Sequence, residues 1–176
     1  MPTATPRGFT APIRRTWLAR ASQTLGAFGV TAVLGLGALG ALAERCSPPS
    51  PQQQVVDQTN QRRAERGLPA LTVDTRLATA AQQHSADQAR YNLMSHTGSD
   101  GSSAGTRITR QGYRWSAWAE NVAAGQRDAT TVMNAWMNSS AHRANILSSN
   151  VTQIGIGLAY SSNGTPYWTM VLARPG

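Results

Sequence analysis

The chain has 176 residues, enough for one domain with a hydrophobic core and too few for two. Its formal net charge of +8 is concentrated at the N-terminus, because residues 44–176 carry 12 arginines against eight acidic residues. That part has no basic run interleaved with aromatics, so nucleic acid is not an expected partner.

Residues 1–43 are predicted to be an export signal. A basic segment precedes an uncharged, glycine-rich run over 25–43, which ends in Ala41-Leu42-Ala43 and predicts cleavage after Ala43. The motif RRTWL at 14–18 resembles a twin-arginine signal. The alternative is an uncleaved anchor, since 19 such residues can just span a bilayer. In either case the rest of the chain works outside the cytoplasm, and membrane contact is expected only through this segment.

Residues 44–54 are rich in Pro, Ser and Gln and are predicted to be an extended linker, followed by a folded domain over 55–176. The linker holds Cys46, the chain's single cysteine, so an intrachain disulfide is excluded.

The first half of the domain reads as helical. VVDQTNQRRAER (55–66) forms a helix that Gly67 and Pro69 end. Asp74 is a suitable N-cap for a helix over about 75–92. Its apolar and small residues fall near one face together with one imidazole, as Leu77, Ala80, Ala81, His84 and Ala89. A Ser/Gly loop over 95–105 and a short helix around 106–111 follow.

The second half ends in strands. Residues 113–125 are aromatic-rich and are expected to be irregular or extended. Asp128 is a cap for a helix over 129–138, and Ser139 or Ser140 a cap for a short helix over 141–147. TQIGIGLAY and YWTMVLAR flank an Asn-Gly turn, which predicts an antiparallel hairpin. Helices first and a hairpin last indicate the α+β class.

Two of the three histidines are mounted where functional groups tend to lie. His96 and His142 stand in or beside Ser/Gly/Asn-rich breaks between elements, whereas His84 is expected to be a packing residue within a helix. Glu120 is an isolated carboxylate among aromatic and small residues, which predicts partial burial. Burial raises a carboxyl pKa unless a cation or donor compensates, and two imidazoles or a metal held between them would do so.

Four segments then indicate a family. TRLATAAQQHSADQARYNLMSHTG, AENVAAG, WMNSSAHRANIL and IGIGLAY…YWTMVLAR resemble, in this order, the bacterial branch of the CAP superfamily, whose domains are also called SCP-like. The resemblance covers essentially the whole folded part. It implies an α-β-α sandwich with a C-terminal antiparallel hairpin and a surface cleft.

The resemblance also implies a set of cleft residues. The family's two histidines correspond to His96 and His142, which in some members bind a divalent metal, often zinc, and its first glutamate corresponds to Glu120. The second glutamate falls on Ser139, so one carboxylate of the tetrad is missing. Glu120 would be the catalytic base if there is one, or an outer residue that orients a histidine.

The resemblance favours a secreted, non-enzymatic protein that binds an apolar small molecule or a cell-envelope component, with zinc or another divalent cation at His96 and His142 modulating the cleft. One alternative is a metal-dependent hydrolase or protease that uses a metal-bound water, with Glu120 as base. Another is a cell-wall-associated interaction module displayed through the linker. The tryptophans 115, 118, 136 and 168 are expected in the core and in the cleft walls.

Overall fold

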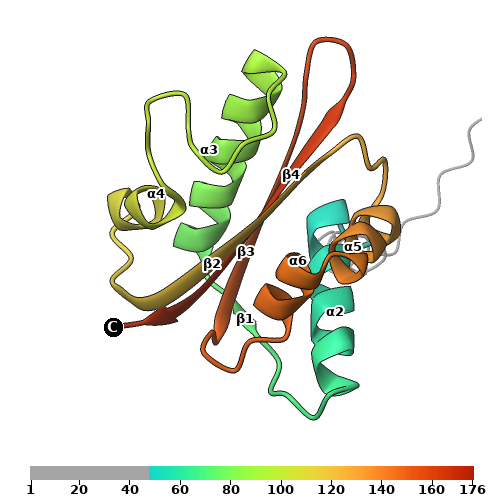
Figure 1. Cartoon of the computed structure of the whole chain (residues 1–176), viewed down its shortest axis with the longest axis vertical. Helices are drawn as coiled ribbons and strands as arrows, with labels where there is room; N and C mark the ends of the chain where they lie inside the picture. Colours follow the sequence, from blue (N-terminus) through green and yellow to red (C-terminus); the bar gives the residue numbers. More distant parts are fainter. Residues whose placement is uncertain (1–47) are drawn as a thin grey trace, which may run out of the picture. The chain divides into compact units, whose positions relative to one another are not determined.

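The fold is described from a computed structural model, in which residues 48–176 are placed. The proposed export signal and Cys46 lie outside these described residues. Helices and strands are interspersed along the chain, which ends in two consecutive strands (Figure 1). The helices are α2 (Pro51–Ala64), α3 (Thr75–Tyr91), α4 (Ala104–Arg110), α5 (Ala129–Asn138) and α6 (Ser140–Ile146). The strands are β1 (Thr72–Val73), β2 (Trp115–Ala124), β3 (Gln153–Tyr160) and β4 (Pro166–Pro175).

Helix α2 begins four residues before the predicted start at Val55, inside the stretch expected to be extended. Ser50 is its N-cap, and its hydroxyl accepts a hydrogen bond from the Gln53 amide at 3.1 Å. Pro51 occupies the first turn, where its fixed φ suits a helix and its missing N–H costs nothing. The Ser-Pro pair is therefore a helix start, and the expectation of an extended chain at 51–54 was wrong.

The predicted caps of two other helices are confirmed. Asp74 accepts from the Arg76 amide at 2.9 Å and begins α3, and Asp128 accepts from the Thr131 amide at 2.7 Å and begins α5. Each carboxylate satisfies one of the amides that the first helical turn leaves without an internal partner. Among the described residues, no helix combines the length and the apolar character that crossing a membrane requires.

The four strands form one mixed sheet in the order β1-β3-β4-β2. The predicted hairpin is confirmed, because β3 and β4 pair antiparallel. The aromatic-rich segment expected to be irregular or extended is a full edge strand, β2, which pairs antiparallel with β4 and places Glu120 opposite Val171. The two-residue strand β1 pairs parallel with β3 and has no counterpart among the predicted elements.

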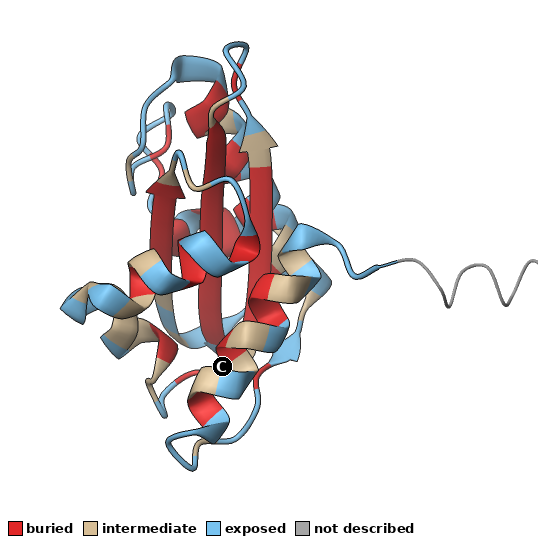
Figure 2. Ribbon diagram, turned by 90° about the vertical axis from the view of Figure 1, so that its right-hand side faces the viewer, coloured by how far each residue is buried: buried red, intermediate tan, exposed pale blue. Residues whose placement is uncertain are grey.

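Helices cover both faces of this sheet, which gives the predicted α-β-α sandwich. Helices α3 and α4 lie on one side, and α2, α5 and α6 lie on the other (Figure 1). Turned by 90°, the strands appear as a buried central layer behind the helices (Figure 2). The core on the α2/α5/α6 side is the larger, and it includes Val55, Val132, Trp136, Ile154, Ile156, Trp168, Met170 and Leu172. The core on the α3/α4 side consists of Leu77, Ala80, Ala81, Ile108, Tyr113, Val171 and Ala173.

Helix α3 lies unusually close to β3 because two residues of that strand have no side chain. A Cβ at Gly155 would lie 2.2 Å from the Ala78 backbone nitrogen, and one at Gly157 would lie 2.3 Å from the Ala81 carbonyl carbon. The intervening Ile156 points to the opposite core, as the two-residue period of a strand requires. The GIG motif therefore sets how closely α3, and the loop that follows it, approaches the sheet.

A buried arginine fixes α6 against α2. The Arg63 side chain donates from Nε to the Pro69 carbonyl at 2.9 Å, and from one terminal nitrogen to the carbonyls of Ile146 and Ser148 at 2.8 and 2.7 Å. The Ile146 and Ser148 carbonyls lie at and just beyond the C-terminal end of α6, where carbonyls lack helical partners and a cation is favourable. Burial lowers the pKa of this guanidinium.

We predict that Gly157→Ala destabilises the fold by about 3 kcal/mol, because the new methyl group meets backbone that cannot move aside without shifting α3. Gly101→Ala is the matched control, since Gly101 has a φ of +79° but open space around its Cβ position. It should cost about 1 to 2 kcal/mol from backbone strain alone. Urea unfolding of the two variants measures the difference, and equal losses would show that close approach is not the constraint at Gly157.

Candidate functional site

The Glu120 carboxylate lies at the centre of the candidate site. It projects from β2, and only 2% of its side chain is exposed. Its Oε1 lies 2.9 Å from His96 Nδ1, and its Oε2 accepts from an Arg107 terminal nitrogen at 2.6 Å. The structure therefore brings His96 and Glu120 together, and both oxygens of the carboxylate are engaged.

The cation that compensates the buried carboxylate is Arg107 of α4, where the sequence had suggested imidazoles or a metal. Its guanidinium also donates to the Ser102 carbonyl at 2.7 Å and to the His96 carbonyl at 3.2 Å. Sequence reasoning did not find this residue, but a signal exists. Arg107 lies between Ala104 and Ile108 on the buried face of a short helix, and a buried arginine requires an anion or carbonyl partners.

Hydrogen bonds with side chains of α3 hold the backbone that carries His96. The His84 imidazole Nε2 lies 2.8 Å from the Ser95 carbonyl, and the Ser95 amide donates to the Gln88 side-chain oxygen at 3.1 Å. The Gln88 amide group in turn donates to Thr169 of β4 at 3.1 Å. Burial lowers the pKa of His84. His84 is thus a packing residue, as the sequence predicted, and it positions the loop next to His96.

Two asparagines connect β2 to α6. The Asn121 side chain donates to the His142 carbonyl at 3.1 Å. The Asn145 side chain donates to Asn121 Oδ1 at 2.8 Å and to the Glu120 carbonyl at 3.3 Å. Asn121 is fully buried, so these bonds form away from water and fix the register of α6 against β2.

The two predicted metal-binding histidines differ in exposure. The His96 side chain is 59% exposed, and His142 is half-buried. The pKa of His142 is lowered first by burial and then, to a smaller extent, by the charge of His96. Ser139 lies at the junction of α5 and α6 and makes no side-chain cap for α6. The side-chain hydrogen bonds of Glu120 go to His96 and Arg107, and not to Ser139.

A surface cavity of about 390 Å³ opens beside this cluster. Its lining combines polar and apolar groups from α4, β2, α6 and the His96 loop. The lining residues are His96, Thr97, Ser103, Ala104, Trp118, Ala119, Glu120 and Asn145. Ser139 and His142, which the resemblance placed in the cleft, are not among them.

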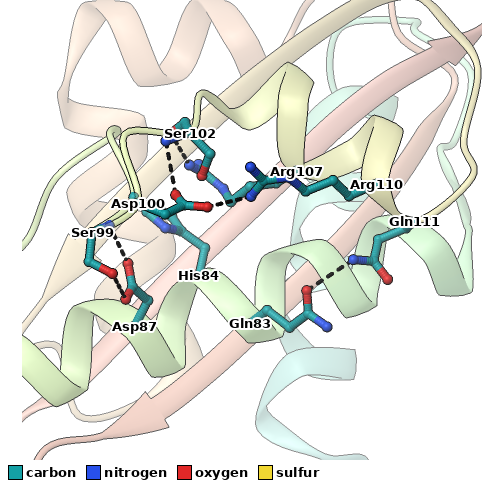
Figure 3. Close-up of a pocket in the computed structure, with 10 residues that line it drawn as sticks. Gln83, His84, Asp87, Ser99, Asp100, Ser102, Arg107, Arg110 and Gln111 are labelled. Atoms are coloured by element: carbon teal, nitrogen blue, oxygen red, sulfur yellow. Dashed lines mark hydrogen bonds and ion pairs between the residues drawn. The ribbon is translucent and has the colours of Figure 1, made fainter.

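A smaller cavity of about 230 Å³ lies behind Arg107 (Figure 3). Its polar side chains bond mainly to one another. Ser99 donates twice to Asp87, at 2.6 and 2.8 Å, and Asp100 pairs with Arg110. Hydrogen bonds from Ser102 and Arg110 hold the pKa of Asp100 well below its usual range. These contacts stiffen the loop that follows His96.

The hydrogen bonds of His96 and Glu120 determine which of their atoms could bind a divalent metal. Because His96 Nδ1 points to Glu120, its Nε2 is left toward solvent, which is the usual arrangement of a metal-binding histidine with a carboxylate behind it. Glu120 itself is not free to coordinate. Within residues 48–176 no three His, Cys, Asp or Glu side chains are grouped as a metal site requires. Among the predicted site residues, the His96 and His142 imidazoles are therefore the side chains left that could act as metal ligands.

Comparison with known proteins places the chain among relatives. The family model described as CAP, "Cysteine-rich secretory protein family", matches residues 56–172. The chain is 36% identical over 118 residues to the uncharacterized protein YkwD of Bacillus subtilis, covering 67% of this chain and 45% of YkwD. It is 30% identical over 120 residues to the uncharacterized membrane protein YlbC of the same organism, covering 66% of this chain and 35% of YlbC.

A solved structure is similar as well. It is an extracellular protein containing a SCP domain from Bacillus anthracis, with a TM-score of 0.64 and 31% identity. The match covers 70% of this chain and 40% of that one. The chain therefore spans less than half the length of each of these three relatives.

We predict that Glu120→Gln lowers the free energy of unfolding by about 3 kcal/mol, because it leaves the buried Arg107 guanidinium without its counter-charge. Glu65→Gln removes the same charge from an exposed pair with Arg62 and should cost less than about 0.5 kcal/mol. Urea unfolding monitored by tryptophan fluorescence compares the two, and a loss at Glu120 no larger than at Glu65 would contradict the assigned role of the pair.

Proposed function

The chain belongs to the CAP family of cysteine-rich secretory proteins, and from this premise we propose that it is a secreted binding protein whose cavity beside His96 takes a component of the cell envelope. The export-signal pattern of residues 1–43 supports secretion, as does the similarity to an extracellular SCP-domain protein. Export by the twin-arginine route is part of the proposal, and rests on the RRTWL motif.

The observation that carries binding over catalysis is the engagement of Glu120. A general base must reach the proton that it removes from the substrate or from water. Glu120 has His96 on one oxygen and Arg107 on the other, and its side chain is almost fully buried. It therefore acts as a structural anchor that fixes the His96 ring at the mouth of the cavity. This disfavours the hydrolase alternative.

The lining of the cavity favours an envelope-derived ligand over a purely apolar one. Ala104, Ala119 and Trp118 offer apolar contact, but His96, Thr97 and Asn145 surround them. An aliphatic chain would displace water from these polar groups and offer no hydrogen bonds in place of those lost, which is unfavourable. A ligand with both polar and apolar faces matches the cavity, and a defined cavity favours a ligand-binding role over a wall-associated module without one.

A divalent cation fits the proposal as a modulator. His96, through Nε2, and His142 would hold it, and zinc is the cation whose preference for imidazole suits this set best. When bound, the cation would add a positive charge and an open coordination position for an oxygen of the ligand. The pKa of His142, lowered by burial and by the charge of His96, leaves that imidazole neutral at neutral pH.

We predict that zinc binds the purified domain at about pH 7.5, and that His96→Ala or His142→Ala weakens binding about tenfold or more. Protons compete for the imidazoles, so affinity should fall in acid; because burial lowers the pKa of His142, the loss at this residue should come below the ordinary range of histidine. Isothermal titration calorimetry measures both effects. Glu65→Gln is the control, because it alters an exposed carboxylate that is not part of the proposed site. Equal zinc affinity in all variants would rule out this site.

The proposed ligand is tested by filling the cavity. Thr97→Trp places a large side chain at an exposed lining position, and Thr152→Trp does the same at an exposed position outside the cavity. Protein exported by a bacterial host is purified and its bound small molecules are identified by mass spectrometry. We expect envelope-derived material with the unaltered chain and with Thr152→Trp, and at least about a tenfold reduction with Thr97→Trp. Equal recovery from both variants would overturn the proposal.

A further inference from the structure

Two exposed tryptophans stand beside the His96 cavity without a role in the core. Trp115 and Trp118 are 38% and 39% exposed, whereas Trp136 and Trp168 are buried. The exposed pair lies on β2, the edge strand of the sheet. Their ring centroids are 6.2 Å apart and the ring planes meet at 82°, so the two indoles form an open corner.

A backbone irregularity produces this corner. In a regular strand, residues three apart point to opposite faces. The pairing of β2 with β4 shifts register between Trp115 and Ala117, which leaves Ser116 as an extra residue. Such a bulge re-aims the side chains that precede it, and here it lets the two indoles meet on one side of the strand.

The corner is held in place although it is exposed. A Cβ at Gly105 would lie 2.8 Å from Trp118 Nε1 and 3.2 Å from Trp115 Cζ2, so both indoles rest on the bare backbone of α4. Trp115 Nε1 also donates to the Thr109 hydroxyl at 3.0 Å. An aromatic surface that is already ordered loses little conformational entropy when a ligand stacks on it.

The corner opens onto its own cavity of about 430 Å³. The walls carry hydroxyl groups and one guanidinium around the two indoles, from Ser103, Thr106, Thr109 and Arg110. Ser103 and Trp118 also line the His96 cavity, so the two hollows are neighbours along β2 and α4. A linear ligand lying across Trp118 would contact both.

Hexose chemistry matches this combination. One face of a pyranose ring presents C–H groups that are attracted to the negative face of an indole, while its hydroxyls at the ring edge exchange hydrogen bonds with hydroxyl and guanidinium groups. A hydrocarbon chain would use the indoles but would leave the hydroxyl rim without partners.

We propose that Trp115 and Trp118 form a stacking subsite for a sugar ring of a linear cell-envelope glycan, whose next unit reaches the cavity beside His96. This inference rests on the proposed binding function and names the chemical class of its ligand. Trp118, which borders both cavities, makes the larger contribution.

The test uses a soluble hexamer of β-1,4-linked N-acetylglucosamine as the probe, titrated into the purified domain and followed by calorimetry. Trp118→Ala should weaken binding about fivefold to tenfold, which is the range that one aromatic stacking contact supplies. Tyr160→Ala is the matched control, because Tyr160 is an exposed aromatic at the far end of β3 and should leave affinity unchanged. Gly105→Ala should also weaken binding, since it displaces both indoles without removing either.

Thermal unfolding of each variant separates loss of the corner from loss of the fold. Binding of the hexamer with equal affinity by Trp118→Ala and the unaltered chain would overturn the subsite. The subsite would also be overturned, in favour of a lipid, if the unaltered chain binds oleate but not the hexamer and Trp118→Ala abolishes the binding of oleate.

The Thr97→Trp variant distinguishes this failure from failure of the proposed function. If Thr97→Trp loses its envelope ligand and Trp118→Ala keeps it, the binding function stands and the glycan subsite does not. If Trp118→Ala loses hexamer affinity while Thr97→Trp keeps its envelope ligand, the corner is a site of its own and the function assigned to the His96 cavity fails.

Discussion

The buried ion pair between Glu120 and Arg107 is the contact on which the candidate site depends. A carboxylate and a guanidinium are both costly to remove from water, and they are stable there because each also has hydrogen-bonding partners. The Arg107 guanidinium reaches the backbone carbonyls of Ser102 and His96, so one side chain ties β2, α4 and the loop between α3 and α4 together. Disturbing either charge would therefore move the loop that presents His96.

Side chains alternate along β2, so neighbouring residues of this strand contact opposite layers of the sandwich. Glu120 points toward α4, and the next residue, Asn121, points to the opposite side, where it contacts Met170 and the backbone of α6. Because β2 is an edge strand, its neighbours on the two faces approach each other around the edge. Glu120 therefore contacts His96 in one layer, and Asn121 contacts the backbone of His142 in the other, although 46 positions separate the two histidines.

Local signals in the sequence were sufficient for much of the fold. Asp74 and Asp128 were identified as caps because capping depends on amides two or three residues away, and the Asn-Gly turn identified the hairpin for the same reason. The start of α2 at Pro51 was missed because proline was weighed as a linker residue and not as a first-turn residue. Strand β1 was missed because two residues carry no periodic pattern, and its pairing with β3 is set by tertiary packing.

The candidate site could be predicted from the sequence only in part. The burial of Glu120 followed from its isolation among apolar neighbours, but its partner did not, because Arg107 is near Glu120 only after α4 packs on the sheet. The position of Ser139 away from the cavity is equally a matter of packing, since it marks the joint between α5 and α6.

Buried polar contacts hold distant segments of this chain together, a role that disulfides have in cysteine-rich proteins. The family is described as cysteine-rich, yet this chain has one cysteine and therefore no intrachain disulfide. Its long-range cross-links are buried side-chain bonds to backbone carbonyls, in which Arg63 joins α2 to the end of α6 and Arg107 joins α4 to the His96 loop. Asn121 adds a third, between β2 and α6. An arginine can donate to several carbonyls at once, and it keeps its charge at any physiological pH. These links therefore do not depend on the redox conditions, whereas a disulfide between two thiols does. Charge and hydrogen bonding thus hold the geometry around His96, together with the packing of α3 on the sheet.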